Sequence, residues 1–295
     1  MTPLPPNTGL DASVLISPCI GGFTAAGVLF VGRYLANHTS IQDKLITPAE
    51  AVELAIAGIP VFPIFENGAK QVGTATGQSD GAFAAALLPT VGLLPDTGVV
   101  IYYAEDFDVQ ASDMAGITDA FAAFGPELPG YGIGIYSCGF CTGRLAAQGL
   151  VTQRWLSCSS SFNGTKQALR NGDYDMAQAV PKDIVVNNRT INVDLDTLRA
   201  AGVDIGARVP WGGAIPQNAP LSVVAVQMLL NKAGQTPPLA TDGGLGPLTK
   251  AAIIASKQKH GLAANTTIDW VNWVPLLCQD AGVRILAPGP APLTS

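Results

Sequence analysis

The sequence predicts an α/β protein built on a (β/α)8, TIM-like barrel, followed by a small all-α unit. Short apolar, β-branched or aromatic runs alternate with Ala-rich segments as far as residue 205, and this alternation stops beyond it. The chain has 295 residues, 48% apolar and 13% charged, so it can bury a large core and is not of the disordered class. Eight strands with intervening helices fit a barrel, although a doubly wound sheet would give much the same pattern.

The predicted strands are short runs that follow one another along the chain. They are residues 9–11, 29–35, 59–65, 99–104, 131–136, 154–158, 175–180 and 191–195. Helices are predicted at residues 48–57, 79–88, 113–124, 139–148 and 164–170, with a short one at 196–201. The helix at residue 48 has the clearest start, because Thr47 can cap it, Pro48 is its first residue and Glu50 lies three residues after the cap.

The C-terminal part has a different character. Residues 206–220 hold three Pro and three Gly without periodicity, which predicts a linker between a barrel domain at 1–205 and a helical domain at 221–285. Helices are predicted there at residues 223–233, 248–259 and 270–281, and residues 286–295 read as a Pro-rich tail. Residues 1–220 carry 11 basic and 19 acidic side chains against five and three beyond, which also indicates two units.

Several functional classes find no support. The net charge of −6 argues against nucleic acid, and neither a P-loop nor a GxGxxG motif after a strand indicates a nucleotide. Residues 12–32 lack charges over the length of a spanning helix, but Pro18 and three glycines interrupt them, so we expect no membrane span. No basic residue precedes Arg33, so no classical signal peptide is predicted.

The five cysteines do not form a disulfide framework, but Cys138 and Cys141 make one CxxC pair. A structural zinc site needs further ligands, and the two histidines, His38 and His260, are far away in the sequence. Incidental thiols, a local disulfide and a metal site are the alternatives, of which incidental thiols are favoured. We predict no metal and no organic cofactor.

Acidic residues end four of the predicted strands, where a (β/α)8 barrel keeps its chemistry. The candidate catalytic residues are Asp11, Glu66, Glu105, Asp106 and Asp108. Strand alternation places Asp106 and Asp108 on one face with Ala104, and Glu105 on the other. Two carboxylates facing one cleft are what glycoside cleavage requires, since each raises the pKa of the other. The alternative is that these acids cap helices or lie in solvated loops.

Six further side chains are candidates for substrate binding: Arg33, Tyr34, Tyr136, Trp155, Gln178 and Asp194. The aromatic rings can stack on sugars or fill the core. Arg33 needs a partner if it points inward, and Asp11 is a plausible one. Gln178 can bind substrate or be a satisfied core amide, and Asp194 ends the eighth predicted strand.

Six segments together resemble a known family. They are GLD at 9–11, FVGRYL at 30–35, TPAE at 47–50, GQSD at 77–80, IYYAEDFD at 101–108 and VDL at 193–195. In order and spacing they resemble the glycoside-hydrolase-like TIM-barrel domain, a domain of unknown function related to the family 25 lysozymes (N-acetylmuramidases). The resemblance covers residues 7–205.

This resemblance implies a cleft at the strand ends and cleavage of peptidoglycan. The lysozymes carry an aspartate at the end of strand one, matched by Asp11, and an Asp-x-Glu at the end of strand four. Asp106 matches the Asp, but Asp108 stands where the Glu would act as general acid. The shorter side chain puts catalytic competence in doubt, because a misplacement of about 1 Å can cost on the order of a hundredfold. Glu105 or Glu66 is the reserve acid.

The C-terminal part resembles the peptidoglycan-binding three-helix module, in the segments VQMLLN at 226–231, TDGGLGPLT at 241–249 and the helix to residue 262. The two resemblances imply an extracellular or wall-facing muramidase of the lysozyme or endolysin type, possessing a wall-binding module and compatible with a phage product. The alternative is a non-catalytic part of a virion or cell-surface assembly that binds glycan or other proteins.

Overall fold

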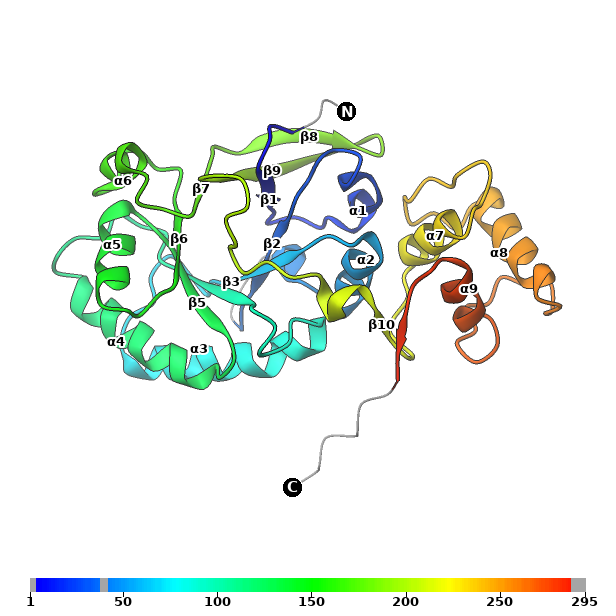
Figure 1. Cartoon of the computed structure of the whole chain (residues 1–295), viewed down its shortest axis with the longest axis horizontal. Helices are drawn as coiled ribbons and strands as arrows, with labels where there is room; N and C mark the ends of the chain where they lie inside the picture. Colours follow the sequence, from blue (N-terminus) through cyan, green and yellow to red (C-terminus); the bar gives the residue numbers. More distant parts are fainter. Residues whose placement is uncertain (1–3, 38–41, 288–295) are drawn as a thin grey trace, which may run out of the picture.

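The computed structural model describes residues 4–37 and 42–287, and its core is a closed barrel of eight strands (Figure 1). The barrel strands are β1 (Thr8–Asp11), β2 (Val31–Leu35), β3 (Val61–Phe65), β4 (Val100–Ala104), β5 (Gly132–Ser137), β6 (Gln153–Leu156), β7 (Met176–Gln178) and β9 (Arg189–Leu198). A further strand, β8 (Lys182–Val186), pairs with β9 outside the closed barrel. Strands β1 to β7 pair in parallel in chain order, and β9 lies between β7 and β1. Because β9 closes the sheet, the barrel prediction is confirmed over the doubly wound alternative.

The closing strand departs from the expected parallel arrangement. Strand β9 runs antiparallel to both β7 and β1, and it forms a hairpin with β8, which the sequence analysis missed. A parallel connection needs a crossover of a dozen or more residues, whereas a hairpin needs only a short turn. Asn187 and Asn188 supply that turn, with φ angles of 51° and 60° that suit a hairpin. The chain therefore returns in the opposite direction.

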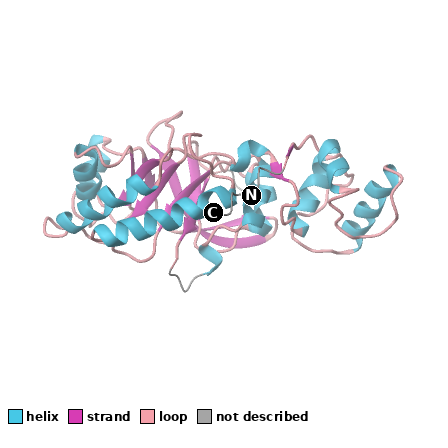
Figure 2. Cartoon of the chain, turned by 90° about the horizontal axis from the view of Figure 1, so that it is seen from below, coloured by secondary structure: helices cyan, strands magenta, loops and turns pink. Residues whose placement is uncertain are grey.

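Helices surround the barrel, as the view from below shows (Figure 2). They are α1 (Ser17–Phe23), α2 (Pro48–Ala57), α3 (Thr74–Leu87), α4 (Met114–Phe124), α5 (Gly139–Ala147) and α6 (Thr165–Asn171), with 3-10 turns at Gln42–Lys44, Leu88–Val91, Gly125–Glu127 and Pro210–Gly213. Helix α2 begins as predicted, with the Thr47 hydroxyl accepting from the Glu50 amide at 3.1 Å. The predicted helix at 196–201 is wrong, because its first residues extend β9 and the rest form a turn.

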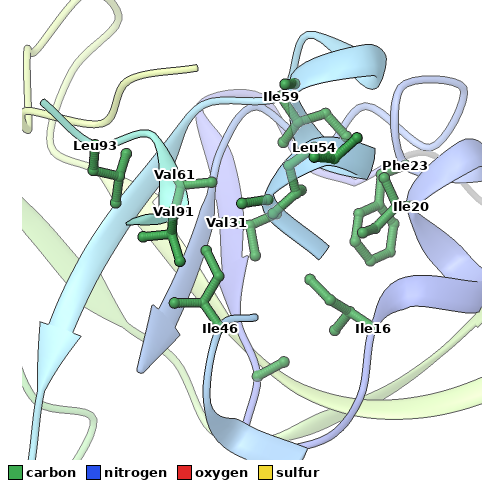
Figure 3. Packing of buried hydrophobic residues seen from close by; sticks show 14 of the residues in the cluster. Ile16, Ile20, Phe23, Val31, Ile46, Leu54, Ile59, Val61, Val91 and Leu93 are labelled. Atoms are coloured by element: carbon green, nitrogen blue, oxygen red, sulfur yellow. The ribbon is translucent and has the colours of Figure 1, made fainter. Parts of the chain in front are cut away.

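Two hydrophobic clusters fill the molecule. Inside the barrel the Phe62 ring makes edge contacts with Phe30, Tyr102 and Trp155, at centroid distances of 5.8, 5.4 and 5.3 Å. Outside it, side chains of α1 and α2 pack against β2 and β3 (Figure 3). The barrel interior is thus a packed core, and the space for a ligand lies at the mouth.

Three further helices follow: α7 (Val223–Lys232), α8 (Pro247–Lys259) and α9 (Val274–Asp280), of which α7 lies next to α2 and α8 lies beyond α7 (Figure 1). Helix α7 packs against α1 and α2 of the barrel. A two-stranded parallel pair, β10 (Ile215–Pro216) and β11 (Ile285–Leu286), joins the segment predicted as a linker to the end of the helical part. Residues 288–295 of the predicted tail lie outside the described residues.

The uncharged run at 12–32 folds into α1 and the start of β2. Within the described ranges, no helix has both the length and the apolar character needed to cross a membrane.

All five cysteines are free thiols, and Cys138 and Cys141 are both buried at the start of α5. The structure therefore has no local disulfide between these two residues, and the interpretation of the pair as incidental thiols stays a prediction. Across residues 4–37 and 42–287, no group of three or more His, Cys, Asp or Glu side chains could hold a metal ion.

Candidate active site

A cavity of about 230 Å³ opens at the mouth of the barrel, at the carboxyl ends of the parallel strands. Strand β9 also reaches it despite running the other way, because its register pairs Asp194 with Asp11 at the end of β1. The lining includes Tyr34, Glu66, Ala104, Asp106, Tyr136, Trp155, Cys158, Ser159, Gln178 and Asp194. The structure therefore brings together candidate residues from the ends of β2 to β7 and from β9, seven strands in all.

Asp11 lies beneath this cavity and is fully buried. Its Oδ1 accepts from the Tyr34 hydroxyl at 2.8 Å, and its Oδ2 accepts from Nε2 of Gln178 at 2.9 Å. The Tyr136 hydroxyl in turn donates to Oε1 of Gln178 at 2.7 Å. Burial and the charge of Asp194 raise the pKa of Asp11, while the hydrogen bonds from Gln178, Tyr34 and Asp196 oppose this effect. These bonds fix four side chains from β1, β2, β5 and β7.

A second buried carboxyl, Asp196, was not singled out from the sequence. It lies two residues after Asp194 on β9, and its Oδ1 accepts from the Trp155 indole at 2.9 Å. Its carboxyl lies within hydrogen-bonding reach of that of Asp11, and burial followed by the Asp11 charge raises its pKa well above the usual range. The signal in the sequence was the spacing of two between the aspartates, which puts both on one face of a strand.

Three acids, Glu66, Asp106 and Asp194, lie in the cavity wall. Burial raises the pKa of Asp194 to about 6, and Asp106 contributes through its charge. Burial and the Glu66 charge also raise the pKa of Asp106, while the nearby Tyr136 hydroxyl lowers it. Glu66 has a counter-ion in Lys44, whose Nζ lies 2.5 Å from Oε2. A carboxyl whose pKa lies near neutral pH, as that of Asp194 does, suits proton transfer.

The predicted pairing of Asp106 with Asp108 does not form in the cavity. Strand β4 ends at Ala104, so strand alternation no longer governs the residues that follow. Asp108 is exposed and accepts from the Asn163 amide at 2.6 Å. Glu105 is buried away from the cavity, with its two oxygens 3.2 and 3.1 Å from the Gln71 amide nitrogen. The segment after β4 thus contributes one carboxyl, that of Asp106.

Arg33 does not point into the barrel and does not pair with Asp11. Its Nε lies 2.6 Å from Oε1 of Glu50 on α2, and both side chains are buried. Its guanidinium also donates to the carbonyl of Ala12. The reason is strand alternation, since Tyr34, the next residue on β2, faces the cavity. This candidate binding residue therefore belongs to the layer between strands and helices.

The aromatic candidates serve the core as well as the cavity. The rings of Tyr136 and Trp155 pack with centroids 4.4 Å apart, and Trp155 is 1% exposed. Tyr34 is more open, and Nζ of Lys44 lies 4.4 Å from its ring centroid. Of the three, Tyr34 offers the ring most accessible to a sugar.

A family model described as Rv2525c-like, glycoside hydrolase-like domain matches residues 22–197. Two crystal structures of the Mycobacterium tuberculosis Tat-secreted protein Rv2525c, in complex with L-tartrate and with HEPES, have the same fold, with a TM-score of 0.57 for each and 17% and 18% identity. Each alignment covers 68% of this chain and 98% of that one. The catalytic domain of endolysin Ply40 from bacteriophage P40 of Listeria monocytogenes aligns at 16% identity and a TM-score of 0.45, over 69% and 95% of the chains. No curated protein matches the sequence.

Proposed function

The chain belongs to the Rv2525c-like, glycoside hydrolase-like domain family, and from this premise we propose that its barrel cleaves the β-1,4 glycosidic bond of peptidoglycan. The observation that carries the proposal is the cavity at the barrel mouth, in whose wall Asp106 and Asp194 lie. The pKa of each of these carboxyls is raised from its ordinary value, and the buried Asp11 lies beneath them. Carboxyl groups in such an environment are the machinery of glycoside cleavage.

The two wall aspartates take different roles in the proposed mechanism. Asp194 is the general acid that protonates the leaving oxygen, because its pKa of about 6 keeps it partly protonated in mildly acidic solution. Asp106 is the carboxylate that supports the positive charge developing on the sugar ring, and its own charge helps Asp194 to hold the proton. Water then adds to the ring carbon and gives a proton back to the carboxylate of Asp194, which completes the hydrolysis. Asp11 positions substrate from below through Tyr34 and Gln178. Activity therefore falls as the pH rises above about 6.

The test measures release of reducing ends from purified peptidoglycan by the full chain. Asp194→Asn and Asp106→Asn are each expected to lower kcat/KM by on the order of 100-fold or more. The matched control is Asp108→Asn, which changes an acid of the same segment outside the cavity and is expected to leave the rate within about twofold. An unchanged rate in Asp106→Asn, with the fold intact, would exclude the mechanism.

We propose further that residues 221–285 hold the protein on the wall. Polar groups of the glycine-rich segment at 241–249 hydrogen-bond to helix α7 and are not directed at a ligand. Nε2 of Gln227 lies 3.0 Å from both Asp242 Oδ1 and the Gly244 carbonyl. A cavity of about 200 Å³ beside this turn, edged by the exposed Leu248, remains for wall contact. Leu248→Asp is expected to reduce the fraction that sediments with insoluble wall. Val271→Asp is the control, because Val271 is 83% exposed and does not line this cavity.

A binding protein without catalysis is the second candidate. The observation in its favour is that the segment after β4 contributes one cavity acid where the lysozymes have a pair. Such a protein would act in a virion or cell-surface assembly. Sedimentation with wall without any lysis in a zymogram supports this candidate, and lysis supports the first.

We propose that either activity takes place outside the cytoplasm. The Tat-secreted protein of the same fold supports this location.

A further inference from the structure

We propose that Asp196 is a positioning residue of the cavity. Its carboxyl keeps a proton and uses it to donate a hydrogen bond to Asp11, so that Asp11 remains a carboxylate that holds Tyr34 and Gln178. The role of the cavity rests on the proposed function, whereas the location of the proton does not.

Each oxygen of Asp11 accepts a hydrogen bond from a neutral donor. The Tyr34 hydroxyl donates to Oδ1 and Nε2 of Gln178 donates to Oδ2. The orientation of the Gln178 amide is set independently, because its oxygen accepts from the Tyr136 hydroxyl. Both oxygens of Asp11 therefore accept hydrogen bonds, and this pattern favours the ionised carboxylate over the protonated acid.

Asp196 has the complementary pattern. Its Oδ1 accepts from the Trp155 indole, a group that can only donate. Its Oδ2 is buried and has no donor directed at it within the described structure, while the Asp11 carboxyl lies within hydrogen-bonding reach. Two ionised carboxylates in contact repel each other, but one proton between them satisfies both. A proton on Oδ2 turns the unpartnered acceptor into a donor to Asp11.

The groups around Asp196 favour its neutral form. Those that interact with it are Asp11 from β1, Tyr34 from β2, Tyr102 from β4, Tyr136 from β5, Trp155 from β6 and Asp194 from β9. None is a cation, so nothing in this set compensates a buried negative charge on Asp196. Burial and these acids raise its pKa, in agreement with the hydrogen-bond pattern.

The test of the proton uses Asp196→Asn. The carboxamide keeps the shape of a protonated acid, with an oxygen to accept from Trp155 and an NH2 to donate to Asp11. A proton held only in the folded state makes the wild-type unfolding constant rise with pH, relative to that of the variant, by about tenfold per pH unit above pH 4. The rise continues up to the pKa of the folded pair, and urea unfolding between pH 4.5 and 7 measures it. A ratio independent of pH means that Asp196 is ionised in the folded protein, and this result overturns the proposal.

The test of positioning compares two substitutions at the same residue. Asp196→Ala, which cannot donate to Asp11, is expected to lower kcat/KM on peptidoglycan at least tenfold, and Asp196→Asn to retain it within about threefold. An Asn variant as damaged as the Ala variant, with both folded, overturns the proposal. If wild-type protein releases no reducing ends, the proposed function fails instead, and the pH dependence of unfolding alone decides whether Asp196 carries the proton.

Discussion

Two adjacent residues on β2 point to opposite faces of the strand and have different roles. Tyr34 faces the cavity and donates to Asp11, while Arg33 faces α2 and pairs with Glu50. The Arg33–Glu50 pair is fully buried. On folding, the two charged groups lose their bound water and interact instead with each other, and the guanidinium also donates to backbone carbonyls. The strand thus couples the floor of the site to the helical layer behind it.

Breaking this buried pair leaves one charge without a partner. Arg33→Met is expected to lower the free energy of unfolding by about 3–5 kcal/mol, because Glu50 remains buried without its guanidinium. Urea denaturation at pH 7 measures the change. Arg208→Met is the control, since its partner Asp204 is 67% exposed and an exposed pair contributes about 1 kcal/mol or less. Equal losses in the two variants would contradict the assigned role of the buried pair.

The site residues show what can be read from a sequence and what cannot. Asp11 and Asp106 were predictable because each follows an apolar run and strand ends carry the chemistry of a barrel. The misplacement of Asp108 came from extending alternation past Ala104, where β4 ends and the loop is shaped by contacts such as that with Asn163. Asp196 was hidden because the residues around it read equally well as a helix. Local pattern does not contain contacts between distant segments.

At the scale of elements, glycines set how closely helices approach one another. Gly139 opens α5, and a Cβ there would lie 2.3 Å from the carbonyl oxygen of Gly164, which precedes α6. Gly143 lies on the exposed side of the same helix, and a Cβ there would meet nothing within 4 Å. One helix therefore contains a glycine required by packing and one that packing does not require.

Opposite effects are expected from the same substitution at these two positions. Gly139→Ala pushes α5 from the backbone at Gly164 and is expected to destabilise by about 1–3 kcal/mol. Gly143→Ala is expected to stabilise by about 0.5–1 kcal/mol through helix propensity. Thermal denaturation followed by circular dichroism compares the two. Stabilisation by both would show that α5 can move away from Gly164 at little cost.

The loop after β3 is tied to the barrel by a buried carboxyl. Glu105 accepts from the Gln71 amide, and burial raises its pKa to about 8. The folded state thus binds a proton that the unfolded chain releases near pH 4.5, so the contribution of Glu105 to stability is complete at low pH and declines as pH rises to about 8.

Replacing Glu105 by Gln removes this pH dependence while keeping an acceptor for the Gln71 amide. Glu105→Gln is expected to gain on the order of 4 kcal/mol over wild type between pH 5 and pH 9. Asp119→Asn on the exposed face of α4 is the control for loss of a charge. Urea unfolding at both pH values measures the difference. A gain no larger than that of the control would mean that Glu105 is ionised in the folded protein.

The direction of the last barrel strand shows the limit of prediction at this scale. The apolar alternation at 191–195 identified β9, but alternation is the same whichever way a strand runs. The clue was the short distance from β7 and the Asn187-Asn188 turn, which allow a hairpin and no crossover helix. Although β9 runs the other way, its pairing of Asp194 with Asp11 still places the Asp194 carboxyl at the mouth of the barrel.

At the scale of the whole molecule, the C-terminal helical part contacts the barrel directly, through α7 and the segment around Thr241. The hairpin tip reaches them through Nδ2 of Asn187, which donates to the Thr241 hydroxyl at 2.9 Å. Gly21 on α1 closes against the same threonine, since a Cβ there would lie 2.2 Å from its Oγ1. The Ser222 hydroxyl, which caps α7, donates to the buried Glu53 on α2. Residues 1–205 and 221–285 remain our proposed domains, joined by these contacts.

The contact between Ser222 and Glu53 makes the stability of the two parts interdependent. Ser222→Ala removes the cap of α7 and a donor to a carboxyl that is 1% exposed, so it is expected to lower the free energy of unfolding by about 2 kcal/mol. Burial raises the pKa of Glu53 to about 7, so this carboxyl contributes most to stability below pH 4.5, and its contribution declines as the pH approaches 7.

Calorimetry of the full chain is expected to show one transition, displaced as a whole to lower temperature in the Ser222→Ala variant. Ser79→Ala, an exposed serine on α3, controls for the loss of a hydroxyl and is expected to change stability by no more than about 0.5 kcal/mol. Two transitions, of which Ser222→Ala moves one, would mean that the helices fold independently and that these contacts do not couple them to the barrel.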